Sequence, residues 1–187
     1  MLLRSKCFFV FIVLLFTPCI VLSQEQGDND SQAGFRSARF DDPCGDPFEQ
    51  NTVWYPIKGK VSKVIDGNTV VVTYGENEVV RVHLVGISLG GSDSGAKAKK
   101  RLSSALLNKN VEVMVDTHWL FLEKKPKHVS GSVHMQEGGY GDIGLVLISE
   151  GLARFTEPPP YTMTPHTQCH YRLAEKEARA KKLGMWR

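Results

Sequence analysis

The stretch that decides the fold is KGKVSKVIDGNTVVVTYGENEVVRVHLVGI, residues 58–87. Residues 58–65, 69–74 and 79–87 are rich in β-branched side chains, which are typical of strands. The tetrapeptide Tyr-Gly-Glu-Asn at 74–77 has the composition of a tight turn between the second and third runs. Three short runs in succession predict three strands of an antiparallel meander.

A helix and two more strands are expected to follow the meander. The loop at 90–95 is rich in Gly and Ser, and Ser92 or Ser94 is the expected N-cap of the helix. The apolar residues that then repeat at helical spacing are Ala98, Leu102, Ala105 and Leu106. Residues 111–115 and 129–135 are expected to be the two strands.

The rest of the chain predicts two further helices. The apolar segment 143–148 is expected to be a short helix that ends at Gly151. Three prolines at 158–160 predict an extended loop, and residues 170–184, with apolar side chains near one face, predict the last helix. This order of elements is that of an α+β fold, a five-stranded barrel with about three packed helices.

The composition is that of an ordinary globular protein. Of the 187 residues, 42% are hydrophobic and 23% are charged, which excludes collagenous, coiled-coil and wholly disordered chains. Four cysteines are too few for a disulfide-dense miniprotein.

Residues 1–23 have the organisation of a cleaved secretory signal peptide. Arg4 and Lys6 precede an apolar run, and short residues lie just before Gln24. A membrane anchor is the alternative, but Pro18 interrupts a run that would need about 20 apolar residues to span a bilayer. We therefore expect a secreted, extracellular protein with no membrane association.

The charge of the remaining chain is unevenly distributed. Residues 1–23 contain two basic residues and no acidic one, so 21 Lys+Arg remain against 20 Asp+Glu. Residues 24–55 carry a net charge of −5 and lack apolar periodicity, so we expect a flexible acidic arm. Asn29 in this arm begins an Asn-Asp-Ser sequon and is a candidate glycosylation site. Residues 56–187 carry +6 and form the expected folded domain.

Cys44 and Cys169 are the two cysteines outside the expected signal peptide. In an oxidising compartment they are expected to pair with each other. The alternative is two free thiols, or two thiols that pair with other chains. A Cys44–Cys169 bridge would tie the acidic arm to the C-terminal region.

Motifs in a fixed order resemble the staphylococcal nuclease-like (thermonuclease) family. They are VIDGNTV at 64–70, HLVGI at 83–87, GLA at 151–153, AEKEAR at 174–179 and GMW at 184–186. The resemblance covers about residues 57–187 and implies an OB-fold barrel. It also implies calcium-dependent hydrolysis of DNA and RNA, in which carboxylates bind Ca²⁺, two arginines neutralise the phosphate and a glutamate activates water.

Several residues that this chemistry needs are replaced. In the family's D-G-D-T motif the first carboxylate is kept as Asp66, but the second, a metal ligand in active members, is Asn68. The family's R-L-x-G-I-D-x-P-E segment puts its phosphate-binding arginine at His83 and its next metal carboxylate at Ser88. The catalytic glutamate of that segment falls at Gly91.

The second arginine is missing as well. Counting back from residues 151–153, the arginine of the family's Y-G-R motif falls at Gly131. Losing one charge-stabilising group costs about 10² to 10³ in rate, so the resemblance implies a catalytically inactive domain. Asp66 alone is a weak metal site, so no cofactor is expected and Ca²⁺ would matter only if activity remains.

Three features could restore activity. Arg81 lies two residues before His83 and therefore on the same face of the strand, where it could substitute for the arginine. Asp93 or Asp142 could supply a carboxylate from a loop. The histidines, which could build an unrelated metal or acid–base site, are His83, His118, His128, His134, His166 and His170. We expect no helical H-x-x-x-H pair among them, and solvated or core positions instead.

Two groups of basic residues are candidates for binding a nucleic-acid backbone. They are Lys97, Lys99, Lys100 and Arg101 on the expected helix, and Lys124, Lys125 and Lys127 further along. The alternative for both groups is a solvated surface. The sequence thus predicts a nuclease-like binding module for extracellular DNA or RNA, or for an unknown protein. The alternative is an active metal-dependent endonuclease with a rearranged site.

Overall fold

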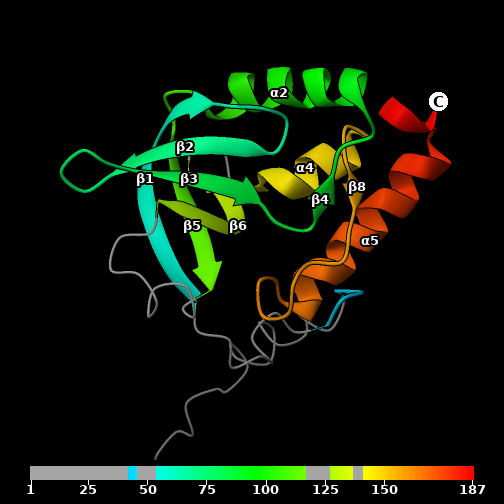
Figure 1. Cartoon of the computed structure of the whole chain (residues 1–187). Coiled ribbons are helices and arrows are strands. Elements are labelled where there is room, and N and C mark those ends of the chain that lie inside the picture. The colour runs from blue at the N-terminus through cyan, green and yellow to red at the C-terminus, as the bar shows by residue number, and fades with distance from the viewer. Residues whose placement is uncertain (1–41, 46–53, 117–126, 137–140) are drawn as a thin grey trace, which may run out of the picture.

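The structure is a computed structural model that describes residues 42–45, 54–116, 127–136 and 141–187 (Figure 1). The expected signal peptide, residues 1–23, lies outside the described residues. So do Asn29, most of the expected acidic arm, and the basic residues Lys124 and Lys125.

Five strands form a closed mixed β-barrel. β1 (Trp54–Val64), β2 (Thr69–Tyr74) and β3 (Glu78–Leu84) make the expected antiparallel meander, β5 (Asn110–Asp116) pairs with β1, and β6 (His128–Met135) pairs with β5. A parallel pairing of β3 with β6 closes the barrel. The predicted α+β architecture, a five-stranded barrel of OB type with three helices among the described residues, is confirmed.

Three two-residue strands lie beside the barrel. β4 (Ile87–Ser88) pairs with β8 (Arg154–Phe155), and β7 (Gly141–Asp142) pairs with the end of β6. The strand predicted over residues 79–87 is therefore two strands. Gly86 separates them with a φ of +75°, a conformation that favours glycine and interrupts the extended backbone.

The helices in the described part of the chain are α2 (Ser92–Leu106), α4 (Ile143–Ser149) and α5 (Pro165–Ala180), and a 3₁₀ turn, η1 (Gly184–Trp186), follows. In the view of Figure 1, α2 lies above the barrel, and α4 and α5 lie to its right. In Figure 1, α4 lies between the barrel and α5. No helix in the described parts of the chain combines the length and the apolarity needed to cross a membrane.

The N-cap expected for α2 is wrong. The cap position is Gly91, whose φ is +95°, and no side chain caps the helix there. The hydroxyl of Ser94 instead donates to the carbonyl oxygen of Gly90 at 3.3 Å from within the first turn. The buried face of the helix includes Ala98, Leu102 and Leu106, as its spacing predicts.

The last helix begins five residues before the position that apolar spacing predicts. Its N-cap is Thr164, whose hydroxyl accepts the backbone N–H of Thr167 at 3.0 Å. Pro165 follows in the first turn, where its missing N–H needs no partner. The consequence is that His166 and Cys169 belong to a helix and not to a loop.

The predicted disulfide is confirmed, with Cys44 bonded to Cys169 of α5 and the two Cα atoms 5.6 Å apart. It holds residues 42–45 against the N-terminal half of α5, where Figure 1 shows them as a short blue segment. The residues joined in this way are 125 positions apart in sequence.

A buried hydrogen bond joins α5 to the start of α4. The hydroxyl of Tyr171, which is 1% exposed, donates to Oδ2 of Asp142 at 2.7 Å. The other carboxylate oxygen caps α4 by accepting the N–H of Gly144 at 2.9 Å. Burial raises the pKa of the Asp142 carboxyl and, together with that carboxyl, the pKa of the Tyr171 hydroxyl.

We expect Tyr171→Phe to lower the free energy of unfolding by about 1–3 kcal/mol, because a carboxylate oxygen loses its donor. Urea denaturation at pH 7 measures the change. The matched control is Tyr161→Phe, since Tyr161 is 81% exposed and its replacement should cost less than about 0.5 kcal/mol. Equal losses in the two variants would contradict this role for the Tyr171 hydroxyl.

Candidate functional site

A cleft of about 400 Å³ opens where the β1–β2 connection meets strands β3 and β6. Its lining residues are Ile65, Asp66, Thr69, Arg81, His83, His128, Val129 and Ser130. Apart from two apolar residues, the lining consists of basic, acidic and hydroxyl side chains. The cleft is therefore polar and suits a charged ligand better than an apolar one.

Barrel closure places the basic residues of the cleft next to one another. In the parallel register of β3 and β6, Arg81 lies opposite His128 and His83 lies opposite Ser130. Side chains alternate along β3, so Val82 and Leu84 point into the core while Arg81 and His83 are exposed. Arg81 and His83 share the cleft, as their spacing predicts.

The β1–β2 connection is ordered by its own side chains. Oδ1 of Asp66 accepts the backbone N–H of Asn68 at 3.0 Å, which is an Asx turn. Oδ1 of Asn68 accepts the hydroxyl of Thr69 at 3.1 Å. The Thr69 hydroxyl also lies 3.4 Å from Nδ1 of His83, so the turn is linked to β3. The Asn68 side chain therefore acts within the turn and does not line the cleft.

The other family positions lie away from the cleft. Ser88 is in β4, opposite Arg154 of β8, and Gly91 is the N-cap of α2. Neither residue lines the cleft. Of the family positions inferred from the resemblance, Asp66 and His83 are the ones that the fold brings together.

The cleft does not fit a calcium ion. Ca²⁺ takes six to eight oxygen ligands, several of them from carboxylates. Among the described lining residues Asp66 is the single carboxylate, and Thr69 and Ser130 add two hydroxyls. The Arg81 guanidinium and the imidazoles of His83 and His128 stand where further carboxylates would be needed.

Gly131 points into the barrel and not into the cleft. A Cβ atom there would lie 2.5 Å from the carbonyl oxygen of Met114 and 3.1 Å from Cγ1 of Val115, so no side chain fits. The neighbouring residue Ser130 lines the cleft and pairs with His83. Of the two neighbouring positions, Ser130 faces the cleft and Gly131 does not.

Two of the four basic side chains on α2 form ion pairs within the protein. Lys97 forms an ion pair with Asp93 at 2.7 Å, and Nε of Arg101 lies 2.9 Å from a carboxylate oxygen of Glu150. Lys99 and Lys100 are exposed. Lys127 is also exposed, and its carbonyl oxygen accepts the N–H of Arg81 at 2.9 Å, so it stands beside the cleft.

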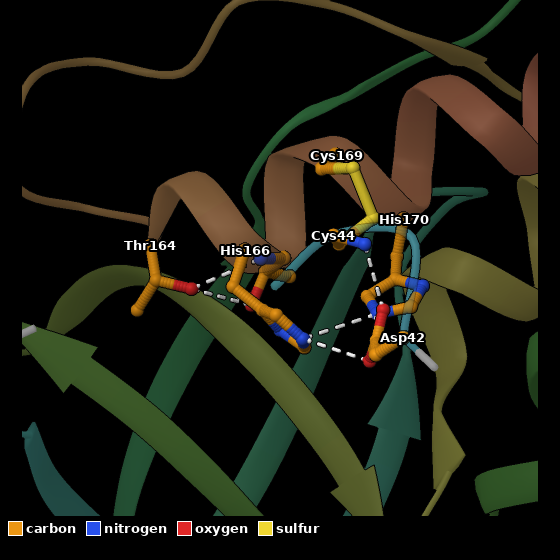
Figure 2. The surroundings of a disulfide bond; sticks show 7 residues. Asp42, Cys44, Thr164, His166, Cys169 and His170 are labelled. Carbon is orange, nitrogen blue, oxygen red and sulfur yellow. Dashed lines mark hydrogen bonds and ion pairs between the residues drawn. A yellow bond between two sulfur atoms is a disulfide. The ribbon is translucent and has the colours of Figure 1, made fainter. Parts of the chain in front are cut away.

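The expectation that no histidines form a helical H-x-x-x-H pair is wrong. His166 and His170 lie one turn apart on α5, and their Nε2 atoms are 3.3 Å apart. Oδ2 of Asp42 lies 3.1 Å from the first of these atoms and 3.2 Å from the second (Figure 2). His166 and His170 are four residues apart in the sequence, so the spacing was present and was overlooked, and the expected helix began only at His170.

Sequence reasoning also missed Thr69 and Ser130 as cleft residues and did not place His128 there. The signal for His128 and Ser130 was present, because residues two apart on a strand share a face. What the sequence does not contain is the parallel register that brings this face of β6 beside Arg81 and His83.

The comparison with protein families agrees with the fold. The model of the staphylococcal nuclease homologue family matches residues 68–187, which is well over half of the chain. The chain belongs to this family. No curated protein matches the chain.

We expect Gly131→Arg to lower the free energy of unfolding by more than about 3 kcal/mol or to prevent folding, because its Cβ would collide with the β5 backbone. Ser130→Arg should fold with a stability within about 1 kcal/mol of the wild type, since its side chain enters the cleft. Circular dichroism and urea denaturation of both variants test the register. A stable Gly131→Arg protein would contradict it.

Proposed function

We propose that the chain is a nuclease-like module that binds the sugar-phosphate backbone of nucleic acid in the cleft, without the family's calcium-dependent hydrolysis. The observation that carries the proposal is the convergence of Arg81, His83 and His128 on two paired strands. Three basic groups face one carboxylate, Asp66, so the cleft favours an anion.

The donor geometry supports a phosphodiester ligand. Arg81 carries a permanent charge and a planar set of N–H donors that matches phosphate oxygens. The imidazoles of His83 and His128 and the hydroxyl of Ser130 supply further donors around it. Lys127 extends the basic surface beyond the cleft, and so could Lys99 and Lys100 of α2.

The proposed absence of the family's hydrolysis is supported by the residues at the positions inferred for its catalytic groups. The general base position is Gly91, a helix cap with no side chain. The metal carboxylate position that follows Asn68 is Ser88, which lies outside the cleft. Without a base or a calcium site, the calcium-dependent route would give little acceleration.

The two imidazoles beside Arg81 favour one alternative activity, the cleavage of RNA without a metal. One imidazole would take the proton of a 2′-hydroxyl as its oxygen attacks phosphorus and the bond to the 5′-oxygen breaks. The other imidazole would donate a proton to the departing 5′-oxygen, while Arg81 neutralises the phosphate. DNA lacks the 2′-hydroxyl and would not be cleaved.

We also propose that the protein is secreted and meets extracellular nucleic acid. A disulfide between distant segments is typical of oxidising compartments. Residues 1–23 have the pattern of a secretory signal. A protein ligand for the same surface is the alternative partner.

The test uses the full chain with its disulfide intact and labelled single-stranded DNA and RNA in a mobility-shift assay. We expect binding that weakens as salt rises, with no need for Ca²⁺. Arg81→Ala should weaken binding about tenfold and reduce the slope of log affinity against log salt by about 0.7. The control is Arg172→Ala, because Arg172 is on α5 and already pairs with Glu157 at 3.0 Å.

Parallel cleavage assays with Ca²⁺ and with chelator separate the alternatives. Calcium-dependent cleavage that disappears in Asp66→Ala would contradict the proposal. Chelator-resistant cleavage of RNA alone, lost in His83→Ala and His128→Ala, would establish the alternative activity. The absence of both binding and cleavage would overturn the nucleic-acid function and leave a protein partner.

A further inference from the structure

A tight turn aims the carboxylate of Asp42 at the N-terminal part of α5. The backbone N–H of Gly45 donates to the carbonyl oxygen of Asp42 at 3.0 Å, which closes the turn. The N–H of Cys44 donates to Oδ1 of Asp42 at 2.8 Å and, as the largest cause, lowers the pKa of that carboxyl. The disulfide fixes the turn on the helix and leaves Oδ2 to face His166 and His170.

Three atoms with lone pairs meet at one point. Nε2 of His166, Nε2 of His170 and Oδ2 of Asp42 form a triangle with sides of 3.1, 3.2 and 3.3 Å (Figure 2). The His166 side chain is 15% exposed, that of Asp42 is 27% exposed and that of His170 is 33% exposed. All three side chains are thus partly exposed, so the cluster lies at the protein surface and solvent can reach it.

Hydrogen bonds to Oδ2 hold this triangle only when both Nε2 atoms carry a proton, because a carboxylate oxygen is an acceptor. If one ring carries its proton on Nδ1, its bare Nε2 faces the carboxylate oxygen, lone pair against lone pair. If both Nε2 atoms are protonated, two donors 3.3 Å apart crowd onto a single oxygen atom. A divalent cation resolves the conflict, because it accepts a lone pair from each of the three atoms.

The spacing matches a tetrahedral zinc ion. Zinc bonds to histidine nitrogen and carboxylate oxygen are about 2.0–2.1 Å long, so two ligand atoms at a tetrahedral ion lie about 3.3 Å apart. The three observed separations are within 0.2 Å of that value, as the shortest is 3.1 Å. We propose that Asp42, His166 and His170 bind Zn²⁺, and that a water molecule completes the fourth position.

The chemistry of the donors favours zinc over calcium. Two imidazole nitrogens and one carboxylate suit Zn²⁺, whereas Ca²⁺ requires oxygen ligands. Cys44 also lies near, with its sulfur within 4.8 Å of the ligand atoms of Asp42 and His170. Its sulfur is in the disulfide, so it does not supply a thiolate. The N–H of Cys44 instead donates to Oδ1 of Asp42 and so orients the carboxylate. Outer partners of metal ligands commonly have this role.

Calorimetric titration of the full chain with ZnCl₂, after chelator treatment and with the disulfide intact, tests the site. We expect one zinc ion per chain. His166→Ala and His170→Ala should each weaken binding at least about 100-fold. Asp42→Asn should do so as well, while it keeps the Oδ1 atom that accepts the Cys44 N–H.

The matched control is His128→Ala, because His128 belongs to the cleft and not to this cluster. Zinc binding in that variant should equal that of the wild type. X-ray absorption of the zinc-loaded chain should show nitrogen and oxygen neighbours and no sulfur. Thermal melts provide a readout independent of titration, since zinc should raise the Tm of the wild type and of His128→Ala but not of His170→Ala.

Three results would overturn the site. The first is wild-type binding no tighter than that of His166→Ala and His170→Ala, provided that both variants keep the wild-type circular dichroism. The second is equal loss of binding in His128→Ala, which would place zinc in the cleft. The third is sulfur in the first coordination shell.

Discussion

The parallel pairing of β3 with β6 is the contact on which the rest of the structure depends. It converts an open sheet into a barrel, and its backbone hydrogen bonds include Arg81 N–H to the Lys127 carbonyl at 2.9 Å. The same register sets Arg81 beside His128 and His83 beside Ser130. Gly131 is required at the next position, because the β5 backbone leaves no room for a side chain. The strand pairing that closes the barrel therefore also forms the cleft.

The local pattern of residues 58–87 was enough to predict the meander, because each strand is short, β-branched and ended by turn residues. The pairing of Cys44 with Cys169 followed from their being the last two cysteines. The cleft was predicted only in part. Arg81 and His83 share a face by simple alternation, but the partners of that face come from a strand that pairs across a long sequence separation.

The start of α5 was predicted wrongly, for a different reason. The prolines before it suggested an extended loop, and the apolar spacing of the helix becomes clear only near its middle. The decisive signal was the dipeptide Thr164-Pro165, a capping residue followed by a proline that suits the first turn. Weighing capping chemistry before apolar spacing would have placed His166 and His170 on one helix face.

The chain has the fold of its family, and the lining of its cleft contains three basic side chains and one carboxylate. Asp66 and His83, two positions inferred from the resemblance, line this cleft together with Arg81 and His128. A family model describes the scaffold, and the chemistry depends on the few side chains that the scaffold presents. The histidine pair on α5 lies outside the cleft lining and adds a second place where the scaffold presents donors.

The bond between Cys44 and Cys169 makes the chain a covalent ring that contains the whole barrel. All strands in the described part of the chain lie inside this ring, as do α2 and α4, and most of α5 lies outside it. A protease that cuts once between the two cysteines would therefore leave a single covalent molecule. The nicked protein could stay folded and would separate into two fragments only after unfolding and reduction. Resistance of this kind protects a protein whose environment contains proteases.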